Sequence, residues 1–189
     1  MTYAIAGIEL LHDGWTKVLR ATVRYPDGRL VRREMEHHGA AVGVLPFDPD
    51  RRVALLISQV RAPPLHVANE AAVLEAPAGL LEEADPEAAA RREAMEETGV
   101  RLRSLDPVAL VWTMPGISTE RMHLFLAPYG EGDRVAAGGG VASENEAIEV
   151  VELPLAELAR RADGGFLSDL KTLLLVQTLR LRRPDLFGG

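Results

Sequence analysis

The sequence predicts a mixed α/β fold, and three observations lead to that prediction. Apolar runs at residues 40–47 and 53–60 have the composition of buried strands. Residues 85–98 carry the start and stop signals of a helix, and residues 15–37 resemble two strands joined by a tight turn. The 189 residues, 47% of them hydrophobic, are enough for one sizeable core. We therefore expect one mixed sheet covered by helices, with an antiparallel β-hairpin or small sheet near the N-terminus.

The N-terminal hairpin is predicted from residues 15–25 and 29–37. Pro26, Asp27 and Gly28 lie between the two runs and suit a tight turn. Arginines along both strands make both faces polar, and such a hairpin is at best marginally stable alone. We expect residues 1–38 to form a β segment that packs on the main domain, residues 39–189, or on a second subunit.

The middle and end of the chain follow the same pattern of short strands and capped helices. Pro63 and Pro64 predict an extended loop after residue 60, and residues 65–72 show no periodicity, so a connection is expected there. Ser168 is the expected N-cap of the last helix. The remaining expected strands are residues 73–77, 107–113, 122–127 and 148–153, and the remaining expected helices are residues 154–161 and 168–182.

The helix at residues 85–98 has clear ends. Asp85 is a suitable N-cap, Pro86 suits the first helical position, and Gly99 supplies a stop. Glu93 and Glu97 lie four residues apart, so both carboxylates project from one face.

Glu96 joins those two carboxylates near the negative end of the helix dipole, where acidic side chains are unfavourable. Arg92 can reach Glu96 one turn away, whereas Glu93 and Glu97 have no obvious partner in the helix. A hard divalent cation bound through oxygens would compensate them. The alternative is a solvated acidic face.

Composition excludes several classes of function. A net charge of −7 disfavours broad contact with nucleic acid or anionic lipid. The apolar runs are far too short to cross a bilayer. There is no cysteine for disulfides or thiolate metal sites, the histidines lack zinc spacing, and no signal peptide is evident, so a cytoplasmic location is expected. The GxSxG, P-loop and GxGxxG motifs are absent from the sequence.

Residues 79–100 resemble the Nudix box, whose pattern is Gly, five residues, Glu, seven residues, then Arg-Glu-apolar-x-Glu-Glu-x-Gly-apolar. Asp85 stands where the pattern has Glu, and only six residues separate it from Arg92. This contraction is similar to the box of the GDP-mannose branch, as are AGGGV at residues 137–141 and SDLKTLLL at residues 168–175. The matching residues are Gly79, Arg92, Glu93, Ala94, Glu96, Glu97, Gly99 and Val100.

The resemblance implies a Nudix-type α/β/α sandwich and a homodimer that exchanges its N-terminal sheet. It also implies two or more Mg²⁺ or Mn²⁺ ions and hydrolysis of the pyrophosphate bond of a nucleotide sugar, GDP-mannose, to GMP and mannose 1-phosphate. Hydrolysis of ADP-ribose to AMP and ribose 5-phosphate is the alternative. A Nudix domain that senses a nucleotide without hydrolysing it is a third possibility.

Several residues receive roles through the resemblance. Glu144 is the alternative base beside Glu146. An ordinary surface role stays open for Arg61 and Lys171, hairpin packing for Trp15, and a plain acidic loop for residues 144–146. The implied metal ligands are the Ala78 carbonyl, Glu93, Glu97 and Glu146; the implied catalytic residues are Glu93, Glu97, Glu144 and Glu146; the implied substrate contacts are Trp15, Arg33, Glu34, Arg61, Glu120, Asn145 and Lys171.

Overall fold

The computed structural model describes residues 2–141 and 147–188. The chain divides into two compact units. One consists of Met1–Ala41 and Leu110–Met122, and the other of Val42–Ala109 and His123–Gly189. The exchange of residues 1–38 between two protomers stays a prediction.

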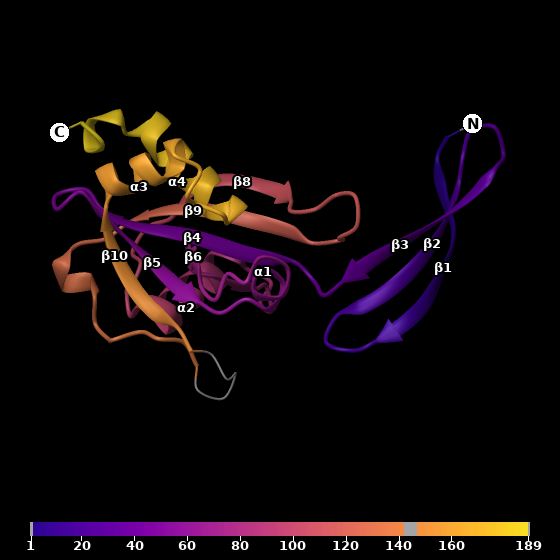
Figure 1. Cartoon of the computed structure of the whole chain (residues 1–189), viewed down its shortest axis with the longest axis horizontal. Coiled ribbons are helices and arrows are strands. Elements are labelled where there is room, and N and C mark those ends of the chain that lie inside the picture. The colour runs from indigo at the N-terminus through magenta and orange to yellow at the C-terminus, as the bar shows by residue number, and fades with distance from the viewer. Residues whose placement is uncertain (1, 142–146, 189) are drawn as a thin grey trace. The chain divides into compact units, whose positions relative to one another are not determined.

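The first unit contains a three-stranded antiparallel sheet of β1 (Ala4–Asp13), β2 (Lys17–Arg24) and β3 (Leu30–His37), in that order (Figure 1). The predicted hairpin is confirmed as β2 and β3, and Gly28 adopts the left-handed φ of 88° that its turn requires. The sequence did not reveal β1, because this strand is exposed along its whole length and its pairing with β2 is interrupted twice. Hydrophobic alternation is therefore weak there.

The second unit is built on a seven-stranded mixed sheet. Its main path is β10 (Glu149–Pro154), β5 (Val53–Gln59), β4 (Ala41–Asp48), β9 (Arg121–Pro128) and β8 (Asp106–Trp112). All five strands were predicted, and β4 and β5 are buried almost throughout. The ends of β8 and β9 beside their connecting loop belong to the first unit.

Two short strands complete this sheet at the point where β4 and β5 separate. β4 pairs with β5 at Phe47 and Ala54, and β6 (Val73–Glu75) pairs with the far end of β5, where Glu75 lies opposite Ile57. β7 (Ala78–Leu80) pairs with β4 and was not predicted. Within residues 75–78 the chain therefore changes its pairing partner from β5 to β4.

Helices cover both faces of this sheet. α2 (Pro86–Thr98) packs against β5 and β7, while α3 (Leu155–Asp163) packs on β10 and on α4 (Leu170–Arg182). Figure 1 shows α2 on one side of the sheet and the α3–α4 pair on the other. The predicted α/β/α sandwich is confirmed. Its core between α2 and the sheet contains Val42, Val44, Leu55, Ala89, Ala90, Ala94, Val100, Leu102, Phe125, Ala127 and Tyr129.

The extended loop predicted from Pro63 and Pro64 is wrong, because Ala62–Ala68 form the helix α1. The first N–H groups of a helix have no intrahelical acceptor, so prolines in the first turn sacrifice no hydrogen bond. Asn69 ends the helix in a left-handed conformation, with φ at 55°. None of the residues of α1 is buried, which explains why the sequence shows no helical periodicity.

The predicted N-cap of the last helix is also wrong by one residue. Asp169, and not Ser168, caps α4, and its carboxylate accepts a 3.0 Å hydrogen bond from the backbone N–H of Thr172. Among the described residues there are also two short 3₁₀ turns, η1 (Glu131–Asp133) and η3 (Pro184–Leu186). Within residues 2–141 and 147–188, no helix combines the length and apolar character needed to cross a bilayer.

Candidate active site

The acidic helix α2 begins and ends where the sequence predicted. Asp85 accepts a 3.0 Å hydrogen bond from the Glu87 N–H, and Gly99 ends the helix with φ at 73°. Asp85, the residue that departs from the Nudix pattern, therefore acts as a helix cap. Glu93 and Glu97 are only 8% and 2% exposed, so the alternative of a solvated acidic face is wrong for this pair.

Both buried carboxylates lie against the backbone of β7. The Ala78 N–H donates a 3.0 Å hydrogen bond to Glu97 Oε2. A Cβ placed on Gly79 would lie 2.0 Å from Glu93 Oε1, so the missing side chain makes room for that carboxylate. Gly79 lies in the extended strand β7 and has no positive φ, so the reason for a glycine here is steric and not conformational. The structure brings Ala78, Glu93 and Glu97 together.

Arg92 connects this pair to the loop before α2. Its guanidinium pairs with Glu96 at 3.0 Å, as predicted, and with Glu93 at 2.9 Å, so the expectation that Glu93 lacks a partner in the helix is wrong. Its shortest contact is the 2.6 Å hydrogen bond from Nε to Glu83 Oε1, and this bond contributes most to raising the pKa of Arg92. Sequence reasoning missed Glu83, because nothing in the loop pattern shows which acidic residue folds back onto the helix.

The residues at this corner fit a divalent cation by ligand type. Glu93, Glu97 and the Ala78 carbonyl offer only oxygens, which suit Mg²⁺ or Mn²⁺. Within the part of the chain that the structure describes, no three acidic or histidine side chains form a metal-binding group. Glu144, Asn145 and Glu146 lie outside the described residues, so their predicted roles stay predictions.

The glycine run at residues 138–140 closes the C-terminal end of α2. The N–H groups of Gly139 and Gly140 donate to the carbonyls of Glu97 and Glu96 at 2.9 and 3.1 Å. Carbonyls in the last turn of a helix have no N–H donor within the helix. The glycine run supplies these donors and therefore acts as a C-terminal cap. All three glycines have positive φ, at 74°, 107° and 81°.

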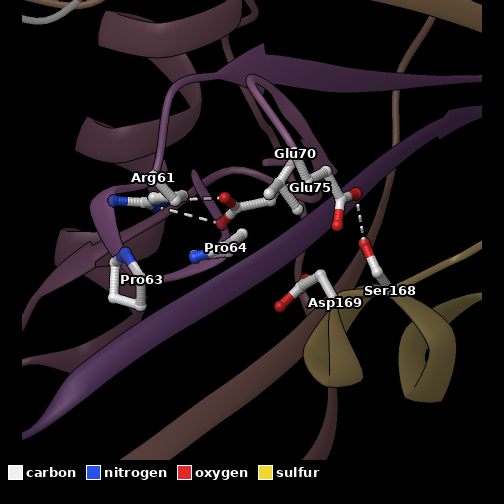
Figure 2. A pocket seen from close by; sticks show the side chains of 8 residues that line it. Arg61, Pro63, Pro64, Glu70, Glu75, Ser168 and Asp169 are labelled. Atoms are coloured by element: carbon white, nitrogen blue, oxygen red, sulfur yellow. Dashed lines mark hydrogen bonds and ion pairs between the residues drawn. The ribbon is translucent and has the colours of Figure 1, made fainter. Parts of the chain in front are cut away.

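A second group of charges surrounds a pocket of about 480 Å³ between β6, α1 and the start of α4. Arg61 donates to Glu75 through Nε and Nη2 at 2.7 and 3.0 Å (Figure 2). Lys171 Nζ lies 2.5 Å from the same carboxylate. Sequence reasoning missed Glu75; the one available signal is a carboxylate in an otherwise apolar strand. The pocket is lined by Arg61, Pro63, Pro64, Glu70, Val73, Glu75, Ser168 and Asp169.

Four further predicted substrate contacts lie in the first unit: Trp15, Arg33, Glu34 and Glu120. Trp15 is 80% exposed, and its ring stacks on His38 with centroids 5.5 Å apart. His38 Nε2 lies 2.8 Å from a carboxylate oxygen of Glu120, and Nδ1 lies 3.1 Å from Glu36. Burial lowers the pKa of His38, but these two carboxylates outweigh it and raise the pKa above 6.5.

Arg33 and Glu34 lie on the exposed surface of β3. The Arg33 guanidinium donates to the Arg32 carbonyl at 3.0 Å, and Glu34 pairs with Arg20 at 3.0 Å. The structure therefore groups Trp15 with Glu120 around His38, whereas Arg33 and Glu34 make only local contacts among the described residues.

Comparison with known proteins supports the resemblance seen in the sequence. A model of the NUDIX domain matches residues 37–173. The GDP-mannose pyrophosphatase of Cronobacter sakazakii is 40% identical over 159 residues, which cover 82% of each chain. That of Pectobacterium atrosepticum is 36% identical over 179 residues, or 92% of each chain. A crystal structure of an ADP compounds hydrolase has the same fold, with a TM-score of 0.77 at 18% identity, and the match covers 98% of this chain and 96% of that one.

Proposed function

Since this chain belongs to the Nudix family, we propose that it hydrolyses the pyrophosphate bond of GDP-mannose and releases GMP and mannose 1-phosphate. The observation that carries the proposal is the buried pair Glu93 and Glu97 against the backbone of Ala78 and Gly79. Arg92 compensates Glu93, and the two buried carboxylates together with the Ala78 carbonyl offer the oxygen ligands that a divalent cation prefers. A protein that only sensed a nucleotide would have no need of this corner. The named relatives favour GDP-mannose over ADP-ribose.

Glu93, Glu97, Glu146 and the Ala78 carbonyl would hold two or more Mg²⁺ or Mn²⁺ ions. When bound, such ions neutralise phosphate oxygens, orient the scissile bond and lower the pKa of a water molecule. The remaining step, removal of the proton from the water molecule, is assigned to a side chain of the protein. Glu144 would accept the proton of the water that attacks one phosphorus, as the bond to the bridging oxygen breaks.

Cationic side chains would hold the remaining charge of the substrate. Arg61 and Lys171 line or border the pocket between β6 and α4 and suit phosphate oxygens. On the first unit, Trp15 offers an exposed aromatic face for a base. Arg33, Glu34, Glu120 and Asn145 complete the proposed set of contacts.

A homodimer that exchanges the N-terminal sheet is part of the proposal. β1 is exposed along its whole length, and Ile5, Ile8 and Leu10 are each more than half exposed. Contiguous apolar side chains on a strand commonly mark an interface. Light scattering tests this point, because a monomer would contradict it. A cytoplasmic location is also proposed, in keeping with a chain that holds no cysteine.

The test is a panel of sugar nucleotides with Mg²⁺, scored as phosphate released after phosphatase treatment. GDP-mannose should be hydrolysed faster than ADP-ribose, and equal or reversed rates would refute the choice of substrate. Glu97→Gln keeps the side chain's shape but removes its charge, and should lower turnover by at least about 10²-fold. Glu87→Gln, on the exposed first turn of the same helix, is the matched control. An active Glu97→Gln variant would remove Glu97 from the site.

A further inference from the structure

Glu75 is a buried carboxylate to which the resemblance assigned no role. It lies at the end of β6 and is 4% exposed. Two guanidinium N–H groups of Arg61 bind its two oxygens at 2.7 and 3.0 Å (Figure 2). The ammonium of Lys171 binds one of these oxygens at 2.5 Å. One side chain therefore fixes both cations proposed to hold the substrate's charge.

The two cations are held in different ways. Lys171 is nearly buried, with its side chain 10% exposed, and it also pairs with Asp169 at 3.1 Å. Arg61 remains 43% exposed at the pocket, and its hydrogen bonds to Glu75 use Nε and Nη2. A bidentate pair of this kind fixes the plane of a guanidinium as well as its position. The outer side of Arg61 thus faces the pocket in one defined orientation.

The start of α4 is tied to the same strand through its backbone. The Ala76 N–H donates a 2.6 Å hydrogen bond to Thr172 Oγ1, and Thr172 is fully buried. Thr172 in turn binds the N-cap residue Asp169. Lys171 and Glu75 therefore lie on elements that are fixed to each other through Ala76, two residues before Ala78.

Charge in this group is balanced, because Arg61 and Lys171 face Glu75 and Asp169. Burial by itself raises the pKa of Glu75, but the bonds from Arg61 and Lys171 outweigh it, so the pKa lies below its usual range. Glu75 is therefore ionised at neutral pH. A balanced group binds an anion less strongly than two unpaired cations would, and this arrangement favours orientation over raw attraction.

We propose that Glu75 is a positioning residue of the hydrolysis reaction, and that it holds the Arg61 guanidinium and the Lys171 ammonium as one unit in the orientation that receives the anionic part of the sugar nucleotide. This inference rests on the proposed function. It differs from a purely structural role in its kinetic consequence. Removing the charge of Glu75 leaves both cations attractive but poorly aligned, so kcat falls while KM does not rise.

The test compares Glu75→Gln with Glu157→Gln under saturating Mg²⁺ and GDP-mannose. Glu157 on α3 is likewise held by two cations, Arg160 and Arg161, but it does not line the pocket, so it is the matched control. We expect kcat of Glu75→Gln to fall by about 10²-fold, the loss associated with a displacement of about 1 Å. Its KM should stay equal or decrease. Glu157→Gln should behave as the wild-type protein.

A second variant keeps the proposal testable if Glu75→Gln does not fold. Arg61→Lys retains the charge and leaves the Glu75–Lys171 pair in place, but it cannot form the bidentate contact. We expect it to lose kcat, and the double variant Arg61→Lys/Glu75→Gln to be no worse than Glu75→Gln alone, because both changes remove one interaction. Additive losses, or a wild-type kcat in either single variant, would overturn the inference.

The wild-type protein in the same assay separates the two proposals. If it hydrolyses none of the sugar nucleotides, the proposed function falls and the role of Glu75 falls with it. If it hydrolyses GDP-mannose and Glu75→Gln matches Glu157→Gln in kcat and KM, only the role of Glu75 is refuted. Lower thermal stability with unchanged kcat would likewise refute it, since that is the result of a purely structural contact.

Discussion

Gly79→Ala tests how closely the backbone of β7 fits the acidic helix. The new Cβ would lie 2.0 Å from Glu93 Oε1, 2.2 Å from its carboxyl carbon and 2.6 Å from Oε2. Ordinary van der Waals contact begins at 3.4 Å, so Oε1 must retreat by about 1.4 Å. The atoms that must move are the end of a flexible side chain, whereas the strand's backbone conformation is open to any residue.

The expected result is therefore a folded protein with a displaced carboxylate. A shift of about 1 Å in a catalytic group can reduce the rate by about 10²-fold, and we expect at least that loss in kcat/KM. Alanine also restricts the unfolded chain, which offsets part of the cost of moving Glu93. The free energy of unfolding should change by no more than about 1 kcal/mol, equivalent to about 2–4 °C in Tm for a chain of this size.

The assay pairs GDP-mannose hydrolysis with thermal unfolding of the same preparations. Gly132→Ala is the control, because a Cβ at Gly132 would meet nothing within 4 Å. Full activity of Gly79→Ala would show that the position of Glu93 against this strand does not matter for hydrolysis. A loss of activity that matches a large loss of Tm would show that the residue serves folding instead.

Two other predictions concern stability. Gly138→Ala should lower Tm, because its Cβ would lie 2.5 Å from the Glu97 carbonyl oxygen, which is rigid backbone, and because its φ of 74° is strained for alanine. We expect the free energy of unfolding to fall by about 1–3 kcal/mol, measured by thermal or urea unfolding. An unchanged unfolding midpoint would contradict the capping role of the glycine run. His38 has a pKa raised above 6.5, so it stabilises the fold fully below that pH and less as the pH rises through the folded value. Urea unfolding between about pH 5.5 and 8.5 should therefore show stability falling more steeply in the wild-type protein than in His38→Gln, and parallel curves would refute this.

Local signals in the sequence were sufficient to predict most of the helices and strands that carry such signals. Interactions within a few residues determine the cap at Asp85, the stop at Gly99 and the buried runs of β4 and β5. The same reasoning failed where the local signal is ambiguous. Proline tolerates both a loop and a first helical turn, so α1 was missed, and two adjacent polar residues, Ser168 and Asp169, were both able to cap α4.

The site shows the same division. Spacing alone placed Glu93 and Glu97 on one face of a helix, and it correctly paired Arg92 with Glu96. It did not reveal that Arg92 also holds Glu83, or that Glu75 binds both Arg61 and Lys171. These contacts join residues that are distant in sequence, so no periodic pattern marks them.

By itself, the sequence determined the fold class, the acidic helix and its family resemblance, because helix and strand periodicity and capping are local properties of the chain. Only the tertiary structure decided which carboxylates are buried, why residue 79 must lack a side chain, and which anion holds the cations of the pocket. The physical reason is that ionic and steric contacts depend on distances between separate elements, and those distances exist only after the sheet and helices have packed together.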